Sequence, residues 1–240
     1  MANSYFQFKQ FTVQQERAAL KVSTDSCLFG AWVADEVRSM KEDVRRVLDI
    51  GAGSALLMLM LAQKCNAAID GIEIDEPSYQ QAKENIEASP WEERLELFHG
   101  DVKQFQFQQK YDFIISNPPF YEGDLKSGAS NRNVAMHDEG LKLDELLEVI
   151  DENLSIDGSF AVLLPYHRAE QFITLAGKHG LFLSQQVNVK QSIKHGYFRS
   201  MLLFNRCQNT ALGEELAIKD ENNQYSVDFI ALLKEYYLYL

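Results

Sequence analysis

Short apolar runs alternate with amphipathic stretches along most of the 240-residue chain. The runs are rich in Val, Ile, Leu and Phe and predict buried strands at 44–50, 69–74, 95–99, 111–117, 159–164, 182–189 and 198–204. Apolar residues at helical spacing predict helices at 51–65, 75–88, 141–153 and 167–179. Because strands that alternate with helices form parallel βαβ units, the pattern predicts an α/β fold with a seven-stranded, mainly parallel sheet and helices on both faces.

Two flanking segments differ from this regular pattern. Residues 1–43 carry loosely alternating aromatic residues and then a polar cap for a short helix, which we expect to end near Asp35 or Glu36. We therefore predict an N-terminal arm and short helix at 1–43, which flank the active site, and a main domain at 44–240. The aromatic residues near the C-terminus favour a docked helix with an aromatic core face over a base-stacking surface.

Composition places the chain among globular proteins. Hydrophobic residues make up 46% of it and aromatic residues 11%, yet no apolar run is long enough to cross a bilayer. The N-terminus lacks the pattern of a secretory signal, and the three cysteines are scattered without metal-like spacing. We expect a cytoplasmic protein, a monomer that binds no metal.

The charge is −12 overall, which argues against a nucleic-acid partner, but it is unevenly distributed. The stretch 171–213 and the loop 126–137 contain no Asp or Glu. A positive face on an acidic body would suit RNA, whereas solubilising charges scattered over the surface explain the same residues equally well. The candidate phosphate contacts are Arg132, Lys190, Lys194 and Arg199.

Glycines follow the first predicted strand of the main domain. Gly51 and Gly53 let a ligand approach the backbone at the start of a helix, where free N–H groups are available. The third glycine of the dinucleotide fingerprint is missing, since Ala55 and Leu56 follow instead. Asp49 would repel phosphate and attract an ammonium or sulfonium group. The segment therefore favours a cationic cofactor.

Acidic residues also end the next two predicted strands. Glu73 closes the second strand, where a carboxylate can accept hydrogen bonds from both hydroxyls of a ribose. Asp101 ends the third strand and could accept the amino group of an adenine, or cap the segment after it. Asp75 is favoured as a helix cap because it precedes Glu76 and Pro77.

Asn117, Pro118, Pro119 and Phe120 end the fourth strand, at the sheet edge where ligands bind in open α/β folds. The two prolines remove two donors and leave the Asn117 side-chain oxygen and the Pro118 carbonyl as acceptors. Two acceptors could hold both hydrogens of a planar amine, and Phe120 could stack on its ring. An ordinary strand-ending turn explains the same residues equally well.

The complete set resembles the class I S-adenosylmethionine-dependent methyltransferases, and Asn117 to Phe120 resembles the motif with which their amino-methylating branch holds a target NH2. Within that branch the chain is similar to the bacterial family that methylates N6 of adenine 37 in tRNA1(Val). The similar segments run nearly end to end: 8–11, 21–25, 30–32, 48–54, 89–91, 114–119 and 223–226.

The resemblance implies a Rossmann-like methyltransferase fold, S-adenosylmethionine as cofactor and an unpaired adenine of tRNA as substrate. It implies catalytic roles for Asn117, Pro118 and Phe120. The cofactor would contact Lys21, Asp25, Asp49, Gly51, Gly53, Glu73, Asp101 and Asn117. The chain departs from the family at Ala55, where glycine is usual, and at Phe120, where tyrosine is more frequent.

Two alternatives stay open. Methyltransferases that act on a release-factor glutamine or on N2 of an rRNA guanine also target a planar NH2. Their N-terminal domains are larger than the N-terminal arm at 1–43 of this chain. A binding module that keeps the cofactor fold but methylates nothing is disfavoured by the intact Asn117 to Phe120 motif.

Overall fold

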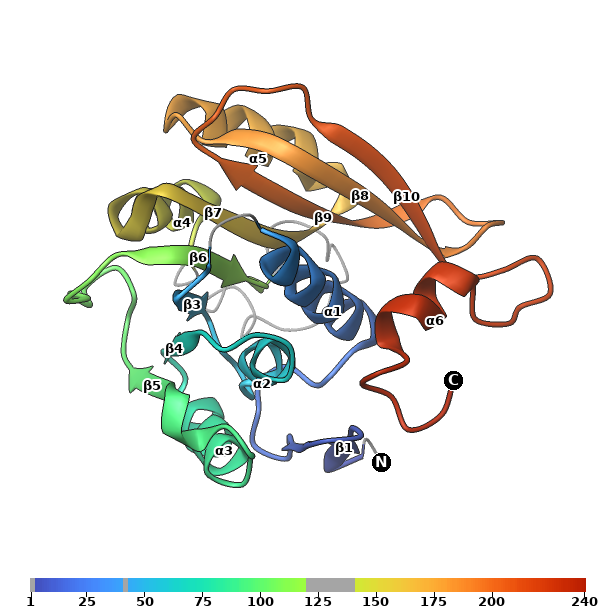
Figure 1. Cartoon of the computed structure of the whole chain (residues 1–240), viewed down its shortest axis with the longest axis horizontal. Helices are drawn as coiled ribbons and strands as arrows, with labels where there is room; N and C mark the ends of the chain where they lie inside the picture. Colours follow the sequence, from blue (N-terminus) through green and yellow to red (C-terminus); the bar gives the residue numbers. More distant parts are fainter. Residues whose placement is uncertain (1–2, 41–42, 120–140) are drawn as a thin grey trace, which may run out of the picture.

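The fold is built on one twisted central sheet (Figure 1), and the computed structural model describes residues 3–40, 43–119 and 141–240. The sheet has eight strands in the order β10-β8-β9-β7-β6-β3-β4-β5. Their bounds are β3 Arg46–Ile50, β4 Ala68–Glu73, β5 Leu95–His99, β6 Tyr111–Ser116, β7 Leu154–Pro165, β8 Phe182–Ser192, β9 Tyr197–Asn205 and β10 Leu212–Lys219. Every neighbouring pair is parallel except β7 with β9 and β8 with β9.

Helices cover both faces of the sheet. One apolar core joins residues of α1, α2, α3 and α6 to one face, and a second core joins α4 and α5 to the other. Neighbouring residues of a strand divide between the two cores, as Val47 and Leu48 of β3 do. The helices are α1 Thr24–Ser39, α2 Leu56–Ala62, α3 Glu76–Glu87, α4 Leu143–Asn153, α5 Tyr166–Lys178 and α6 Val227–Leu233, with a short 3-10 helix η1 at Glu92–Arg94.

The predicted α/β class and mainly parallel sheet are confirmed, but the predicted number of seven strands is wrong. The additional strand, β10, is an edge strand that pairs only with β8. Its first four residues are exposed, and it buries only Leu216 and Ile218. Its one continuous apolar run, Leu216 to Ile218, is only three residues long, so the hydrophobic pattern missed this edge strand.

The N-terminal segment forms a small hairpin and then a core helix. Strands β1 (Tyr5–Gln7) and β2 (Thr12–Gln14) pair antiparallel. Helix α1 begins after Ser23, whose side chain caps it, and extends to Ser39, beyond the predicted end near Asp35 or Glu36. Ten of its residues are buried, and seven of them share one core with α2 and the sheet. The division at residues 43 and 44 stays a prediction.

The predicted docking of an aromatic C-terminal segment is confirmed for Phe229 and Tyr236, whereas Tyr225 and Tyr239 are exposed and lie outside α6 (Val227–Leu233). Helix α6 lies beside α1 (Figure 1), and Phe229 and Tyr236 are fully buried. The Tyr236 hydroxyl donates to the Met60 carbonyl over 3.0 Å, and Tyr237 forms an isolated β-bridge with Phe8. The first and last segments of the chain therefore lie side by side.

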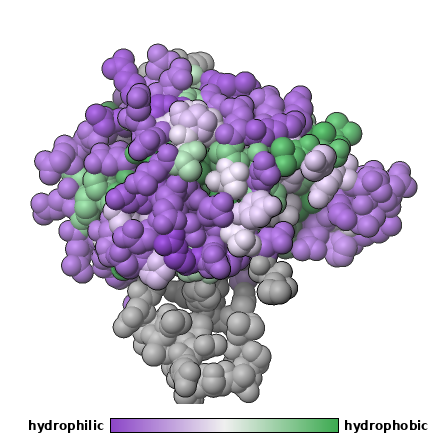
Figure 2. All heavy atoms as spheres, turned by 90° about the horizontal axis from the view of Figure 1, so that it is seen from below, coloured by the Kyte–Doolittle hydropathy of each residue, from purple (hydrophilic) through white to green (hydrophobic). Residues whose placement is uncertain are grey.

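Hydrophilic side chains cover most of the face shown in Figure 2, with apolar side chains in small groups between them. Among the described residues, no helix has both the length and the apolar character needed to cross a membrane.

Candidate active site

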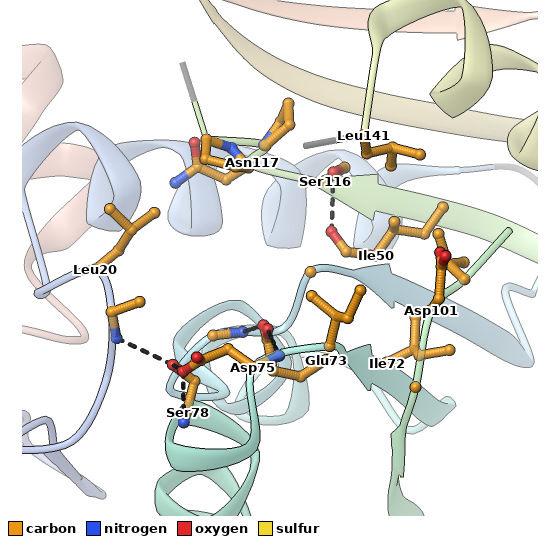
Figure 3. Close-up of a pocket in the computed structure, with 18 of the residues that line it drawn as sticks. Leu20, Ile50, Ile72, Glu73, Asp75, Ser78, Asp101, Ser116, Asn117 and Leu141 are labelled. Carbon is orange, nitrogen blue, oxygen red and sulfur yellow. Dashed lines mark hydrogen bonds between the residues drawn. The ribbon is translucent and has the colours of Figure 1, made fainter. Parts of the chain in front are cut away.

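A cavity of about 260 Å³ lies at the carboxyl ends of the parallel strands. In Figure 3, Ser116 and Asn117 line one side of it, and Glu73 and Asp75 line the opposite side. The predicted residues that line it are Gly51, Gly53, Glu73, Asp101, Asn117 and Pro118. Ligands bind at this edge in open α/β sheets, so the strand ends bring the predicted residues together where chemistry is expected.

The glycine loop after β3 has an unusual backbone. Gly51 has φ +77°, Gly53 has φ +57° and Ala55 has φ +62°, all in the left-handed region. A Cβ built on Gly51 would meet nothing within 4 Å, so there is open space beside this residue at the cavity wall. Glycine is favoured here because of its left-handed backbone conformation and not because space is short. Ala55 is the residue at which the family usually has glycine. The backbone of Ala55 adopts a conformation that favours glycine, and the alanine methyl group therefore adds strain on the order of 1–2 kcal/mol just before α2.

Glu73 joins three parts of the cavity wall. It ends β4 and is only 8% exposed. One carboxylate oxygen accepts from the Gly53 N–H over 2.8 Å, and the other accepts from the Asp75 N–H over 2.8 Å. The carboxylate therefore holds the glycine loop at a fixed distance from the start of α3. The predicted cap is confirmed, because the Asp75 carboxylate accepts from the Ser78 N–H over 3.0 Å.

Asp101 lines the cavity after β5, and its carboxylate accepts from the Lys103 N–H over 3.0 Å. Three apolar side chains that were not predicted from the sequence also line the cavity: Leu20, Ile74 and Val102. Ile74 and Val102 directly follow Glu73 and Asp101 in the sequence. Their position next to the predicted acidic residues could have been used to predict that they line the cavity. Ile74 is 62% exposed, which is unusual for isoleucine and leaves an apolar surface for a flat ring at the mouth.

Asn117 follows β6 directly and lines the cavity together with Pro118 and Pro119. The Ser116 hydroxyl donates to the Ile50 carbonyl over 2.9 Å and so ties the end of β6 to the end of β3. The Asn117 side chain makes no hydrogen bond to any residue that the structure describes, which leaves its amide oxygen available to a ligand. Phe120 lies outside the described residues.

Asp49 is a buried acid with no partner among the described residues. It is 1% exposed, and neither carboxylate oxygen has a hydrogen bond. Burial, followed by repulsion from Glu73, raises the pKa of Asp49 from 3.8 to about 8. A buried carboxylate without a partner is costly unless it faces a cation or is protonated. Asp49 does not line the cavity itself, but it precedes the glycine loop that does.

These observations fit a cofactor that carries a positive charge, a ribose and a flat base. Asp49 supplies an uncompensated buried carboxylate, and Glu73 supplies a carboxylate at the cavity wall. The exposed apolar side chains at the mouth suit a planar ring, and the open space at Gly51 suits a ligand that touches the backbone. Among the described residues there is no cluster of three or more His, Cys, Asp or Glu that could hold a metal ion.

Lys21 and Asp25 lie outside this cavity. The Lys21 ammonium donates to the carbonyls of Gln15, Glu16 and Ala18, at 3.1 Å for Glu16 and 3.2 Å for Ala18. Asp25 lies in the first turn of α1 and forms an ion pair with Arg199 over 2.8 Å. The predicted contact of these two residues with the cofactor stays a prediction.

The basic residues predicted to contact RNA phosphates already make contacts within the protein. Lys190 pairs with Glu215 over 2.9 Å and lies over the Tyr197 ring at 4.4 Å. The Lys194 ammonium donates to the Glu221 carbonyl over 3.0 Å, and Arg199 binds Asp25. Arg132 lies outside the described residues. Contact of these side chains with RNA stays a prediction.

Helix α3 holds residues 14–22, which we call the strap, against the cavity. Asn85 is 2% exposed, and its side-chain amide bonds both the N–H and the carbonyl of Gln14 over 2.8 Å. The same Asn85 amide donates to the Ser54 carbonyl in the glycine loop over 2.9 Å. Ser78 accepts from the Ala19 N–H over 3.0 Å. Since Ala19 and Leu20 line the cavity, α3 determines where one of its walls lies.

Replacing Asn85 with alanine should therefore lower the free energy of unfolding by about 2–4 kcal/mol, because it leaves backbone groups of Gln14 and Ser54 without partners. Urea denaturation measures this. The control is Gln80→Ala on the exposed side of the same helix, which should change stability by less than about 0.5 kcal/mol. Equal losses in the two variants would contradict the role of Asn85.

Comparison with known proteins agrees with the fold. The family model for the "Methyltransferase small domain" matches residues 34–158. A predicted O-methyltransferase of Agrobacterium tumefaciens has a similar structure, with a TM-score of 0.66 at 13% identity over 88% of this chain and 96% of that one. The glycopeptide N-methyltransferase MtfA, solved with sinefungin, has a TM-score of 0.57 at 12% identity over 79% and 89% of the two chains. Fold and site define a class I methyltransferase.

Curated sequences identify the family within this class. A tRNA1(Val) (adenine(37)-N6)-methyltransferase of Flavobacterium psychrophilum is 39% identical over 97% of this chain and 99% of its own length. The protein of the same name from Pectobacterium carotovorum is 39% identical over 98% of this chain and 94% of its own length. The chain belongs to the tRNA1(Val) (adenine(37)-N6)-methyltransferase family.

Proposed function

We propose that the protein transfers a methyl group to N6 of an unpaired adenine in tRNA, and that the adenine is number 37 in the anticodon loop of tRNA1(Val). The methyl donor is S-adenosylmethionine, the cofactor of class I methyltransferases. The observation that carries the proposal is the Asn117 amide, which has no partner among the described residues and lines the same cavity as Glu73 and Asp101. We propose further that the enzyme acts as a monomer in the cytoplasm.

When bound, S-adenosylmethionine supplies a methyl group on a positively charged sulfur, which makes the methyl electrophilic. Asp49 would lie near that positive charge, and Glu73 would accept hydrogen bonds from the ribose hydroxyls. Asp101 would accept from the amino group of the cofactor's adenine, between the apolar side chains of Ile74 and Val102. The glycine loop leaves room for the remaining part of the cofactor.

Asn117 and Pro118 act on the substrate amine. The lone pair of an adenine N6 is delocalised into the ring, so the nitrogen is a poor nucleophile while it stays planar. The Asn117 side-chain oxygen and the Pro118 carbonyl would accept its two hydrogens and favour a pyramidal nitrogen that directs its lone pair at the methyl group. The extra proton can leave to water after transfer. The protein's contribution is therefore positioning, and an unpaired base is needed because pairing would hide N6.

The function is tested by incubating the purified protein with labelled S-adenosylmethionine and, separately, with bulk RNA and with a protein extract. We expect label in the tRNA fraction, where nucleoside analysis should identify N6-methyladenosine. The Asn117→Ala variant is the control for contaminating activity. Label in N2-methylguanosine or in a protein glutamine would replace this proposal with one of the two alternative methyltransferases.

The buried acid gives a prediction about pH. Because burial raises the pKa of Asp49 to about 8, we expect Asp49 to hold a proton at pH 7 in the cofactor-free protein. A cation bound nearby stabilises the charged carboxylate and lowers its pKa, so binding should release up to about one proton near pH 7. Affinity should then rise with pH between about 6 and 8 and level off above that range.

Calorimetry in two buffers with different ionisation enthalpies counts the released protons. The Asp49→Asn variant is the matched control, because it keeps the shape and cannot titrate. It should release fewer protons than the wild type at pH 7. The same proton count in both proteins would show that Asp49 does not respond to the cofactor.

A further inference from the structure

A second hollow of about 450 Å³ lies beside the start of α1, and we call it the flank groove. It is formed by the first turn of α1, the β8–β9 turn, the end of β10 and the loop before α6. Its polar and aromatic lining includes Asp25, His195, Phe198, Lys219, Asn223 and Tyr225. Two of the segments that carry the family resemblance, 21–25 and 223–226, therefore meet at one place outside the cofactor cavity.

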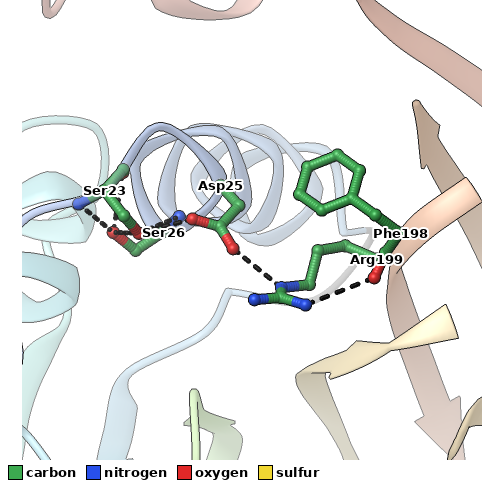
Figure 4. A network of polar contacts seen from close by, with 5 residues as sticks. All are labelled: Ser23, Asp25, Ser26, Phe198 and Arg199. Atoms are coloured by element: carbon green, nitrogen blue, oxygen red, sulfur yellow. Dashed lines mark hydrogen bonds and ion pairs between the residues drawn. The ribbon is translucent and has the colours of Figure 1, made fainter. Parts of the chain in front are cut away.

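The flank groove lies near the cavity. Leu20 lines the cavity and Thr24 lines the groove, and four Cα steps of 3.8 Å keep these residues within about 15 Å of each other. Arg199 of β9 pairs with Pro165, the last residue of β7, so it lies at the same carboxyl edge of the sheet as Asn117. From there its guanidinium binds Asp25 in the groove wall (Figure 4). A strand of RNA whose target base enters the cavity would have neighbouring nucleotides at this distance.

The chemistry of the groove suits a nucleotide. Tyr225 is 41% exposed, and its ring is held by stacking on Phe229 with ring centroids 4.6 Å apart. The Asn223 backbone has φ +61°, and the Asp220 carboxylate fixes its turn by accepting from the neighbouring N–H groups of Asn222 and Gln224. An aromatic ring that is held in place and a nearby side-chain amide are the groups with which proteins bind unpaired bases.

The charges in the groove also suit a phosphate. Asp25 is the only acid among its lining residues, and the ion pair with Arg199 neutralises it. The Lys219 ammonium has no ion-pair partner among the described residues. The His195 ring is oriented by a 2.7 Å hydrogen bond between its Nδ1 and the Ser192 hydroxyl. The lining is therefore neutral or positive, although the protein as a whole is acidic.

We propose that the flank groove binds an unpaired nucleotide next to the methylated adenine, with Tyr225 against the base, Asn223 at the base edge and Lys219 at a phosphate. The inference rests on the proposed function and adds a second point at which the RNA is recognised. A single flipped base offers little to distinguish one RNA from another, so a contact with its neighbour would contribute to the choice of substrate.

The test uses Asn223→Gly, which removes the side-chain amide and tolerates the left-handed backbone, and Lys219→Gln. Each variant is compared with wild type on anticodon stem-loop RNAs that lack one base beside the target. We expect each variant to raise the KM for intact RNA about tenfold, with cofactor affinity and kcat within twofold. Removal of one neighbouring base should weaken wild type similarly, and Asn223→Gly should lose nothing further on that RNA.

The matched control is Asn222→Gly, in the same turn but outside the groove lining. It should behave like wild type on every RNA. Unchanged KM in both groove variants, or an equal further loss on the RNA that lacks the base, would overturn the inference while leaving the proposed function intact. Wild-type protein that methylates no RNA at all would instead overturn the proposed function.

Discussion

Replacing Asn117 with alanine should lower the single-turnover rate of methyl transfer by about two orders of magnitude or more, while S-adenosylmethionine binds within a few-fold of wild type. The reason is that the Asn117 oxygen would act on the amine of the substrate and not on the cofactor. No described residue uses the side-chain amide for structure, so its removal should not disturb the fold. The loss is expected in the rate of chemistry and not in assembly of the site.

Rapid-quench kinetics with saturating RNA measures this rate, and calorimetry measures cofactor affinity. The matched control is Asn66→Ala, an exposed asparagine just before β4 at the opposite edge of the sheet. It should leave both quantities unchanged. If Asn117→Ala lowers rate and cofactor affinity by the same factor, Asn117 is structural and the proposed handling of the amine is wrong.

Replacing Glu73 with glutamine should weaken S-adenosylmethionine ten- to a hundredfold, or about 1.4–2.7 kcal/mol. The carboxylate already accepts hydrogen bonds from Gly53 and Asp75, and it is expected to accept from the ribose as well. Glutamine keeps one acceptor oxygen for the backbone and replaces the other with a donor. It therefore tests the ribose contact with less damage to the loop than alanine would cause.

Cofactor affinity is measured by calorimetry on protein whose thermal stability matches wild type. Glu87→Gln, at the last residue of α3 and exposed, is the control and should bind the cofactor normally. Affinity of Glu73→Gln within twofold of wild type would remove Glu73 from the cofactor site. It would leave Glu73 as a structural brace between the glycine loop and α3.

Much of the fold could be predicted because the signals for its helices and strands lie within short segments of the sequence. The central parallel strands are buried on both faces and form apolar runs in the sequence, so β6 was predicted at 111–117 and is observed at Tyr111–Ser116. The cap at Asp75 depends only on residues three positions apart, and it too was predicted. The cavity residues at strand ends followed from a general rule, because parallel strands place their carboxyl ends at one edge.

The remainder depends on contacts between distant parts of the sequence. Asp25 and Arg199 are 174 positions apart, and no periodicity indicates that they pair. Asn85, Ser78 and Gln81 on α3 hold the strap against the cavity, so nothing close to Leu20 in the sequence indicates that it lines the cavity. Strand β10 depends on backbone pairing with β8 more than on its own apolar residues.

The most direct test of the account is to map the methyl group that the purified protein adds to a transcript of tRNA1(Val). We expect N6-methyladenosine at adenine 37 and at no other position, and no product on a transcript in which guanosine replaces that adenine. N6-methyladenosine elsewhere in the transcript, or equal labelling of both transcripts, would contradict the claim that the cavity beside Asn117 receives adenine 37.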